Sequence, residues 1–337
     1  MPDGSSPSPD PARELRALMA EGRFQDALAA FERAEDPGVR RRPELLLLAA
    51  SAATRVGNWR AGASHAEAAL DGFEARADAD GQMRALNLLG ILALEQGHLT
   101  GGVRQLDRAL HLARQLGDSL MTARVSNNLA SAVHQQGKLA AALSLFRASL
   151  LSYQRLGDRR GTAETYHNLG VVFRQQEEWS EAEEASSQAV RHAELVQERA
   201  LVAQAMMGRA EIHLDRRELA VARRELARAA QIAAEAHDEI GLAEAARLRA
   251  LMALNEGDAA LALSEAEAAH AAALAHGSAL QQAECVAVAA RALRAAGRGQ
   301  EAEARRVEAV RLFGVLGAVK WLADFAEKWE GDASSER

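Results

Sequence analysis

The stretch ALNLLGILALEQGHLTGGVRQLDRALHLARQLGD, residues 85–118, returns forty residues later as VSNNLASAVHQQGKLAAALSLFRASLLSYQRLGD, residues 125–158. Leu89 aligns with Leu129, Gly97 with Gly137, and the closing Gly-Asp pair recurs as well. A fixed period of this length is typical of stacked helical hairpins and not of one globular core. The repeat therefore predicts an all-α fold that grows unit by unit.

A turn motif, a Gly or polar residue two places before an apolar one, extends this period in both directions. It recurs near residues 22, 57, 97, 137, 177, 217, 257 and 297. A second boundary, such as Gly117-Asp118 or Gly277-Ser278, closes each unit. Gly ends a helix in the left-handed conformation, and the Asp or Ser that follows is expected to cap the next helix. Glu177 and Arg217 replace Gly, so we expect those two turns to differ in geometry.

The units resemble tetratricopeptide repeats. The first helices carry the pairs Leu89-Gly90, Leu129-Ala130 and Leu169-Gly170, and a Gly follows at the turn. The forty-residue period and the phrase LGDRRGTAETYHNLGVVF are similar to the longer variant in kinesin light chains, LGN-type polarity adaptors and the sensor arrays of bacterial NB-ARC-type regulators. The resemblance covers about Arg13 to Gly317. It implies a right-handed α-solenoid with a concave groove that binds extended peptides.

We therefore expect a right-handed α-solenoid of about eight hairpins over residues 11–317, followed by a C-terminal capping helix over 318–330. The polar segments 1–10 and 331–337 offer little to bury and are expected to be disordered.

Composition narrows the function classes. The formal net charge is −7, with 20 Lys and Arg against 18 Asp and Glu through Arg160 and 20 against 29 after it, so a nucleic-acid partner is not expected. No basic cluster precedes an apolar run at the N-terminus, and no stretch of eighteen apolar residues occurs, so no membrane partner is expected. The single cysteine, Cys285, excludes an internal disulfide and suits a reducing cytosol, which predicts a cytoplasmic protein.

Polar side chains form one stripe on the first helices of repeats three to five. The stripe predicts a peptide-binding site at Arg84, Asn87, Arg124, Asn127, Asn128, Ser131, His134, Gln135, His167, Asn168, Arg174 and Gln175. The resemblance implies that the Asn positions contact an extended peptide, which an amide can do because it offers both a donor and an acceptor. The arginines would add bonds to acidic groups of the partner. The alternative is a solvated polar face, although Glu and Lys are the usual choice there.

Motifs for catalysis are missing. The sequence has no phosphate-binding glycine loop, no nucleophile elbow and no H-E-x-x-H, and no two histidines lie three or four residues apart. No cofactor and no metal site are expected. Cys285 lies in an Ala-rich and Val-rich helix and is expected to be a small buried side chain.

The C-terminal helix carries an apolar stripe that includes Trp321, Phe325 and Trp329. One interpretation is a cap that covers the last hairpin. The other is an interface for a partner or a second copy of the chain, because Trp residues are frequent interface anchors.

These patterns predict a non-catalytic scaffold or adaptor that binds a peptide or protein in the concave groove of repeats three to five. The alternative is a sensing module that binds a ligand or peptide and transmits a change of superhelical shape to a partner.

Overall fold

The computed structural model describes residues 11–34 and 36–335, so the leader 1–10 and the last two residues of the expected tail lie outside the described part. The helices are α1 (Pro11–Ala20), α2 (Phe24–Arg33), α3 (Pro37–Arg40), α4 (Pro43–Arg55), α5 (Trp59–Ala75), α6 (Ala79–Glu95), α7 (Leu99–Gln115), α8 (Ser119–Gln135), α9 (Leu139–Leu156), α10 (Arg159–Gln175), α11 (Trp179–Val196), α12 (Arg199–Asp215), α13 (Leu219–Glu235), α14 (Glu239–Glu256), α15 (Ala259–His276), α16 (Ala279–Ala295), α17 (Gly299–Leu316) and α18 (Val319–Ser335).

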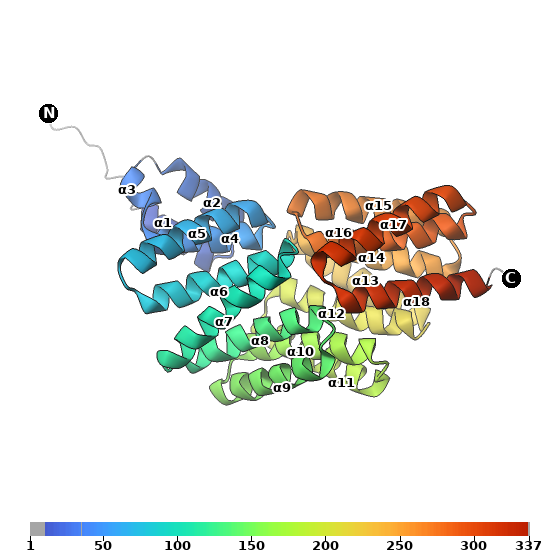
Figure 1. The fold of residues 1–337 in the computed structure, drawn as a ribbon, viewed down its shortest axis with the longest axis horizontal. Helices are drawn as coiled ribbons and strands as arrows, with labels where there is room; N and C mark the ends of the chain where they lie inside the picture. Colours follow the sequence, from blue (N-terminus) through green and yellow to red (C-terminus); the bar gives the residue numbers. More distant parts are fainter. Residues whose placement is uncertain (1–10, 35, 336–337) are drawn as a thin grey trace.

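The all-α prediction is confirmed, because every regular element within these residues is a helix. Apart from the short α3, the helices pair consecutively as eight hairpins with α18 added at the end (Figure 1). From α4 to α18, successive even-numbered helices pack directly on one another. The even-numbered helices therefore form the inner side of the arc, and we call their surface toward its interior the inner face.

The boundaries between hairpins follow from the turn residues. The side chains of Asp118, Asp158 and Asp238 each accept a hydrogen bond from the backbone N–H three residues on, at 2.9 to 3.0 Å. These bonds satisfy N–H groups that a helix leaves open at its start. Ser278 is an exception, because its side chain makes no such cap and bonds Glu95 instead. The capping expectation therefore holds for the Asp positions and is wrong for Ser278.

The turns at Glu177 and Arg217 do not differ from the others as expected. Both residues adopt the left-handed conformation, with φ of 57° and 60°, close to the 76° of Gly137. A side chain in this region costs roughly 1 kcal/mol more than Gly, so the packing of the flanking helices outweighs the local preference.

Small residues let neighbouring helices approach, but not equally at each repeat. A methyl group at Gly90 would lie 2.5 Å from Cγ of Leu106, whereas one at Gly170 meets nothing closer than 3.6 Å. We expect Gly90→Ala to lower the free energy of unfolding by about 1–3 kcal/mol through overpacking. Gly170→Ala should be neutral or stabilising by up to about 1 kcal/mol, since Ala favours the helix. Urea unfolding of both variants tests this, and an equal effect would contradict the packing argument.

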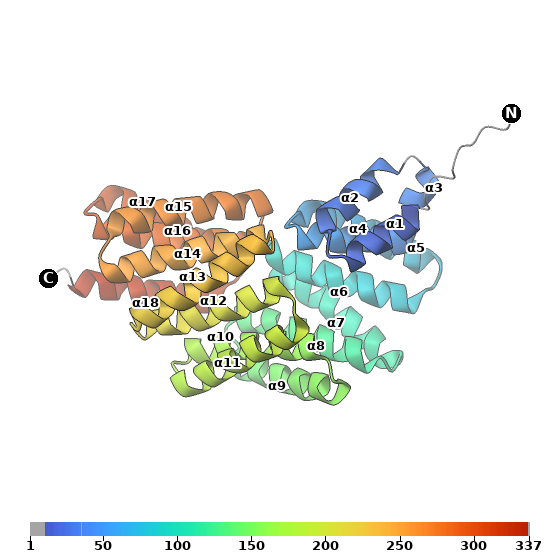
Figure 2. The same cartoon turned by 180° about the vertical axis from the view of Figure 1, so that it is seen from behind.

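The arc closes on itself. The inter-helix turns of the N-terminal half meet the starts of helices in the C-terminal half, at the upper centre of Figure 1 and again from behind in Figure 2. Arg55, at the end of α4, pairs with Glu198 before α12. Ser278 Oγ donates to Oε2 of Glu95 at 3.2 Å, and burial raises the pKa of that carboxyl group. We call these contacts, with those of α8 and α18 below, the seam.

Helix α18 extends to Ser335, beyond the predicted end at residue 330. Its aromatic residues pack on Phe313 and Leu316 of α17 and on Val286 of α16. Phe325 is 6% exposed, with its ring 6.3 Å from that of Phe313. The helix therefore covers the apolar end of the last hairpin, as the capping interpretation requires.

Candidate functional site on the inner face

The polar stripe predicted from the sequence lies on the inner face of α6, α8 and α10, and its side chains bond one another across repeats. Nδ2 of Asn128 donates to Oδ1 of Asn87 at 2.8 Å. The hydroxyl of Thr165 donates to Oδ1 of Asn127 at 3.1 Å. Each bond joins helices that are neighbours in space but about forty residues apart in sequence. The stripe is therefore a ladder between repeats, and Asn87 and Asn127 are buried in it.

The ladder continues from α8 to α10 through His134. Its Nε2 lies 2.5 Å from Oε1 of Gln175, and since that oxygen only accepts, the imidazole N–H donates. Burial lowers the pKa of His134, which keeps the ring neutral. Burial likewise lowers the pKa of His167, which packs against the backbone of α12 at Gly208. Both histidines are structural members of the inner face.

Two predicted amide side chains have no such partner. Within the described residues, neither the amide of Asn168 on α10 nor that of Gln135 on α8 makes a hydrogen bond, and both are half-buried. Ser131 uses its hydroxyl on the backbone oxygen of Asn127, within its own helix. The donors and acceptors open to a ligand are therefore concentrated at Asn168 and Gln135, on neighbouring helices.

The predicted arginines are already engaged or lie outside the ladder. Arg174 is 13% exposed and bonds Asp215 at 2.6 Å and Glu211 at 3.2 Å. Arg84 pairs with Asp80 one turn earlier, on the exposed side of α6. Arg124 is also exposed and lies beside Met121. Asp215 and Glu211 thus pair with the guanidinium of Arg174, so an acidic group of a partner would have to displace them.

A cluster of charges on α12, α14 and α16 was not predicted. Arg247, with 7% of its side chain exposed, lies 2.6 Å from Glu244, 3.0 Å from Glu211 and 4.0 Å from Glu284. Burial and the neighbouring carboxylates raise the pKa of Glu284 to about 6, although Arg247 opposes them. The sequence carried a signal, because Glu164, Glu244 and Glu284 share one position of the repeat.

Helix α18 reaches this cluster and the end of α8. The ring of Trp321 lies 5.0 Å from that of His134, and its Nε1 donates to Oε1 of Glu284 at 2.9 Å. Nζ of Lys328 lies 3.2 Å from Oδ1 of Asp215. Trp329 packs under the guanidinium of Arg294, at 4.6 Å. Trp321, Phe325 and Trp329, the candidate interface residues, thus make contacts within the chain.

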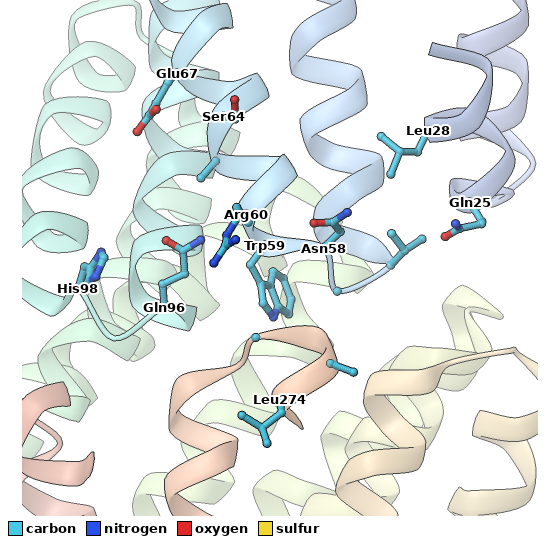
Figure 3. A pocket seen from close by; sticks show the side chains of 15 residues that line it. Gln25, Leu28, Asn58, Trp59, Arg60, Ser64, Glu67, Gln96, His98 and Leu274 are labelled. Carbon is cyan, nitrogen blue, oxygen red and sulfur yellow. The ribbon is translucent and has the colours of Figure 1, made fainter. Parts of the chain in front are cut away.

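A cleft of about 950 Å³ opens at the seam, away from the predicted residues. Its walls are the turns before α5 and α7 and the turn between α15 and α16. In Figure 3, Trp59 projects from the start of α5 toward the end of α15, where Leu274 lies, and Arg60, Gln96 and His98 lie to one side of it. Nε1 of Trp59 is buried there without a hydrogen-bond partner among the described residues. Closing the seam therefore leaves a donor unsatisfied, which costs roughly 1–3 kcal/mol.

The described residues offer neither a metal site nor a membrane-spanning helix. No group of three or more His, Cys, Asp or Glu side chains among them could hold a metal ion. None of their helices is long and apolar enough to cross a membrane. Cys285 is fully buried, and burial raises the pKa of its thiol.

The fold has known counterparts. Residues 121–194 match the family model of the tetratricopeptide repeat. A Rap protein complexed with the Competence and Sporulation Factor is 16% identical, with 92% of this chain and 84% of that chain covered and a TM-score of 0.74. The Rap conjugation gene regulator of the plasmid pLS20, in complex with the Phr* peptide, is 15% identical. The match covers 81% of this chain and 76% of that chain, with a TM-score of 0.67.

A third solved structure is the aspartyl phosphate phosphatase F from Bacillus subtilis. It is 11% identical, with 91% of this chain and 85% of that chain covered and a TM-score of 0.63. No curated protein sequence matches the chain. At these identities the likeness shows the fold alone. The chain is thus a helical-repeat protein whose residues 121–194 match the tetratricopeptide repeat.

Proposed function

We propose that this protein is a non-catalytic adaptor or regulator that binds a peptide segment of a partner on the inner face of α8 and α10. The open amides of Asn168 and Gln135 carry this proposal. They lie on neighbouring helices and are half-buried, so an extended backbone between them would exchange its bonds to water for bonds to protein. The two Rap structures, each titled as a complex with a signalling factor or a peptide, support the same class of ligand.

Replacing Asn168 by alanine tests the proposal, because this amide has no partner within the chain. Peptides selected from a displayed random library on the full chain serve as probes. We expect Asn168→Ala to weaken their binding by about 1–3 kcal/mol, the value of a hydrogen bond lost at a partly buried site. Fluorescence anisotropy measures the affinity. Asn128 is unsuitable for this test, because its removal also leaves the buried oxygen of Asn87 without a donor.

The matched control is Gln188→Ala, which removes an exposed amide from the outer helix α11 that bonds only Glu184. Its affinity and its unfolding should equal those of the wild type. Equal binding by the Asn168 variant, or a library that yields no inner-face binder, would refute the proposed site.

A second candidate function, a sensor that changes shape, is favoured by the seam. The contacts of Arg55 with Glu198 and of Ser278 with Glu95 are polar, and the buried Nε1 of Trp59 would gain a water partner on opening of the seam. Both features narrow the free-energy gap between the closed and the open arc. A ligand that prefers one of them would shift the chain between the two, and small-angle scattering with and without a bound peptide would detect the change.

A further inference from the structure

The last helix presents side chains to the same inner face that the proposed peptide would use. Lys328 occupies the position of the repeat held by Asn128 on α8 and Asn168 on α10, since 168 plus four periods of forty gives 328. Its ammonium group does not stay on α18 but reaches across to Asp215 on α12. A side chain in a ligand-facing position thus forms an ion pair with the opposite wall.

Trp321 makes the second contact of this kind. Its ring lies against His134 at the end of α8, while its N–H bonds Glu284 on α16. The two residues therefore join α18 to α8, α12 and α16. Trp321 supplies a flat apolar surface with a donor at its edge, and Lys328 supplies a cation two turns further along the helix.

The charges of the wall fit such an occupant. Among the described residues, Glu211, Asp215, Glu244 and Glu284 supply four carboxylates, and Arg174 and Arg247 supply two guanidinium groups. Lys328 is the third cation of the cluster and the one supplied by α18. A cationic segment complements this surface, whereas an acidic one would meet like charge.

Removing these two side chains from the wall does not require α18 to unfold. The helix is also anchored by Phe325, which is buried on α16 and α17, whereas the side chain of Lys328 is 45% exposed. An ion pair this exposed contributes little to stability. The contacts of Trp321 and Lys328 can therefore exchange with those of an incoming chain while the helix stays in place.

We propose that Trp321 and Lys328 are a built-in occupant of the inner face between α8, α12 and α16, and that this face docks a partner segment carrying an aromatic ring and a cation. The inference rests on the proposed function and names the chemistry of its partner. It replaces the acidic partner expected from the arginines. In the absence of the partner, the chain's own side chains compete for the site.

The experiment uses the full chain and a labelled synthetic peptide that copies residues 319–332, VKWLADFAEKWEGD. The double variant Trp321→Ala with Lys328→Ala empties the site. Because an occupied site lowers apparent affinity by the fraction that is free, we expect the double variant to bind the probe at least about tenfold more tightly than the wild type. A probe with Glu in place of the lysine that copies Lys328 should lose that gain in affinity, as should the emptied chain that also carries Asp215→Asn.

The matched control is Trp321→Ala with Lys320→Ala, because Lys320 pairs only with Asp324 on its own helix. Its affinity for the probe should rise less than that of the emptied chain. Circular dichroism shows whether loss of the indole unfolds α18. If it does, Lys328→Ala alone, a change at an exposed position, still tests whether emptying the site raises the affinity for the probe.

Three outcomes would overturn the inference. If emptied and wild-type chains bind the probe equally, and Asn168→Ala weakens both, the inner face binds peptides but α18 does not occupy it. If neither chain binds the probe or any library peptide, the proposed function fails as well. A wild-type mass in light scattering of twice 36.1 kDa that falls to 36.1 kDa in the double variant would place the α18 of a second copy in the site.

Discussion

Replacing Arg247 by methionine is expected to lower the free energy of unfolding by about 3–5 kcal/mol, the usual cost of removing one partner from a buried ion pair. Its guanidinium bonds Glu244 and Glu211 and lies near Glu284. Methionine fills much of the same space, so a cavity contributes little. The cost arises because the remaining carboxylates stay buried without their cation.

Arg249→Met is the control, since it removes an arginine from the same helix. Arg249 pairs with Glu265 at 2.9 Å and is 40% exposed, so its loss should cost no more than about 1 kcal/mol. Urea unfolding at pH 7 compares the two variants. Similar losses would mean that the Arg247 cluster is solvated and contributes no more than a surface pair.

The pH dependence of the free energy of unfolding is a second test of the Arg247 cluster. The pKa of Glu284, about 6 in the folded chain, lies above its ordinary value, so the folded state binds this proton more tightly than the unfolded state does. Stability from this group is present at low pH and is lost as pH rises through 6. We expect acidification from pH 7 to pH 5 to recover more stability in Arg247→Met than in the wild type. Below that window Glu211 acts oppositely, since Arg174 and Arg247 lower its pKa.

Replacing Phe325 by alanine should cost about 3–5 kcal/mol, the usual range for a large aromatic removed from a core. Its ring packs between those of Phe313 and Trp329, so its removal leaves a cavity between them. Hydrogen exchange should rise in α16, α17 and α18 and, through the contact of Trp321 with His134, at the end of α8.

Leu261→Ala is the comparison, because Leu261 on α15 is 48% exposed and little area is lost. A rise in exchange confined to α18 would contradict the seam, and a uniform rise over all hairpins would contradict the stacked fold. The pattern therefore separates a local cap from a helix that also holds the arc closed.

The sequence was sufficient for the fold because the repeat is visible in it. Turn residues such as Gly97 and Gly137, and caps such as Asp118 and Asp158, act within a few residues of their partners. Their effects add up to a hairpin without knowledge of the superhelix. The likeness to kinesin light chains in particular stays a prediction.

The site was predicted in part, because its residues share a face but their partners come from other repeats. The amides of Asn87 and Asn128 were expected to face a ligand, and they face each other. Arg174 was expected to bond an acidic group of a partner, and it pairs with Glu211 and Asp215 on the next inner helix. Which side chains meet across the arc depends on its curvature, and no pattern along a single helix encodes that.

The seam also limits how the gene can change. Arrays of this kind usually lengthen or shorten by duplication or loss of a unit, because each unit touches only its neighbours. Here Arg55 meets Glu198, Glu95 meets Ser278 and His134 meets Trp321, each pair several hairpins apart. A unit gained or lost between the two residues of such a pair would move them apart, so the contact could no longer form. The number of hairpins from α4 to α18 is thus set by the circumference of the closed arc, and only the hairpin before α4 is free to vary.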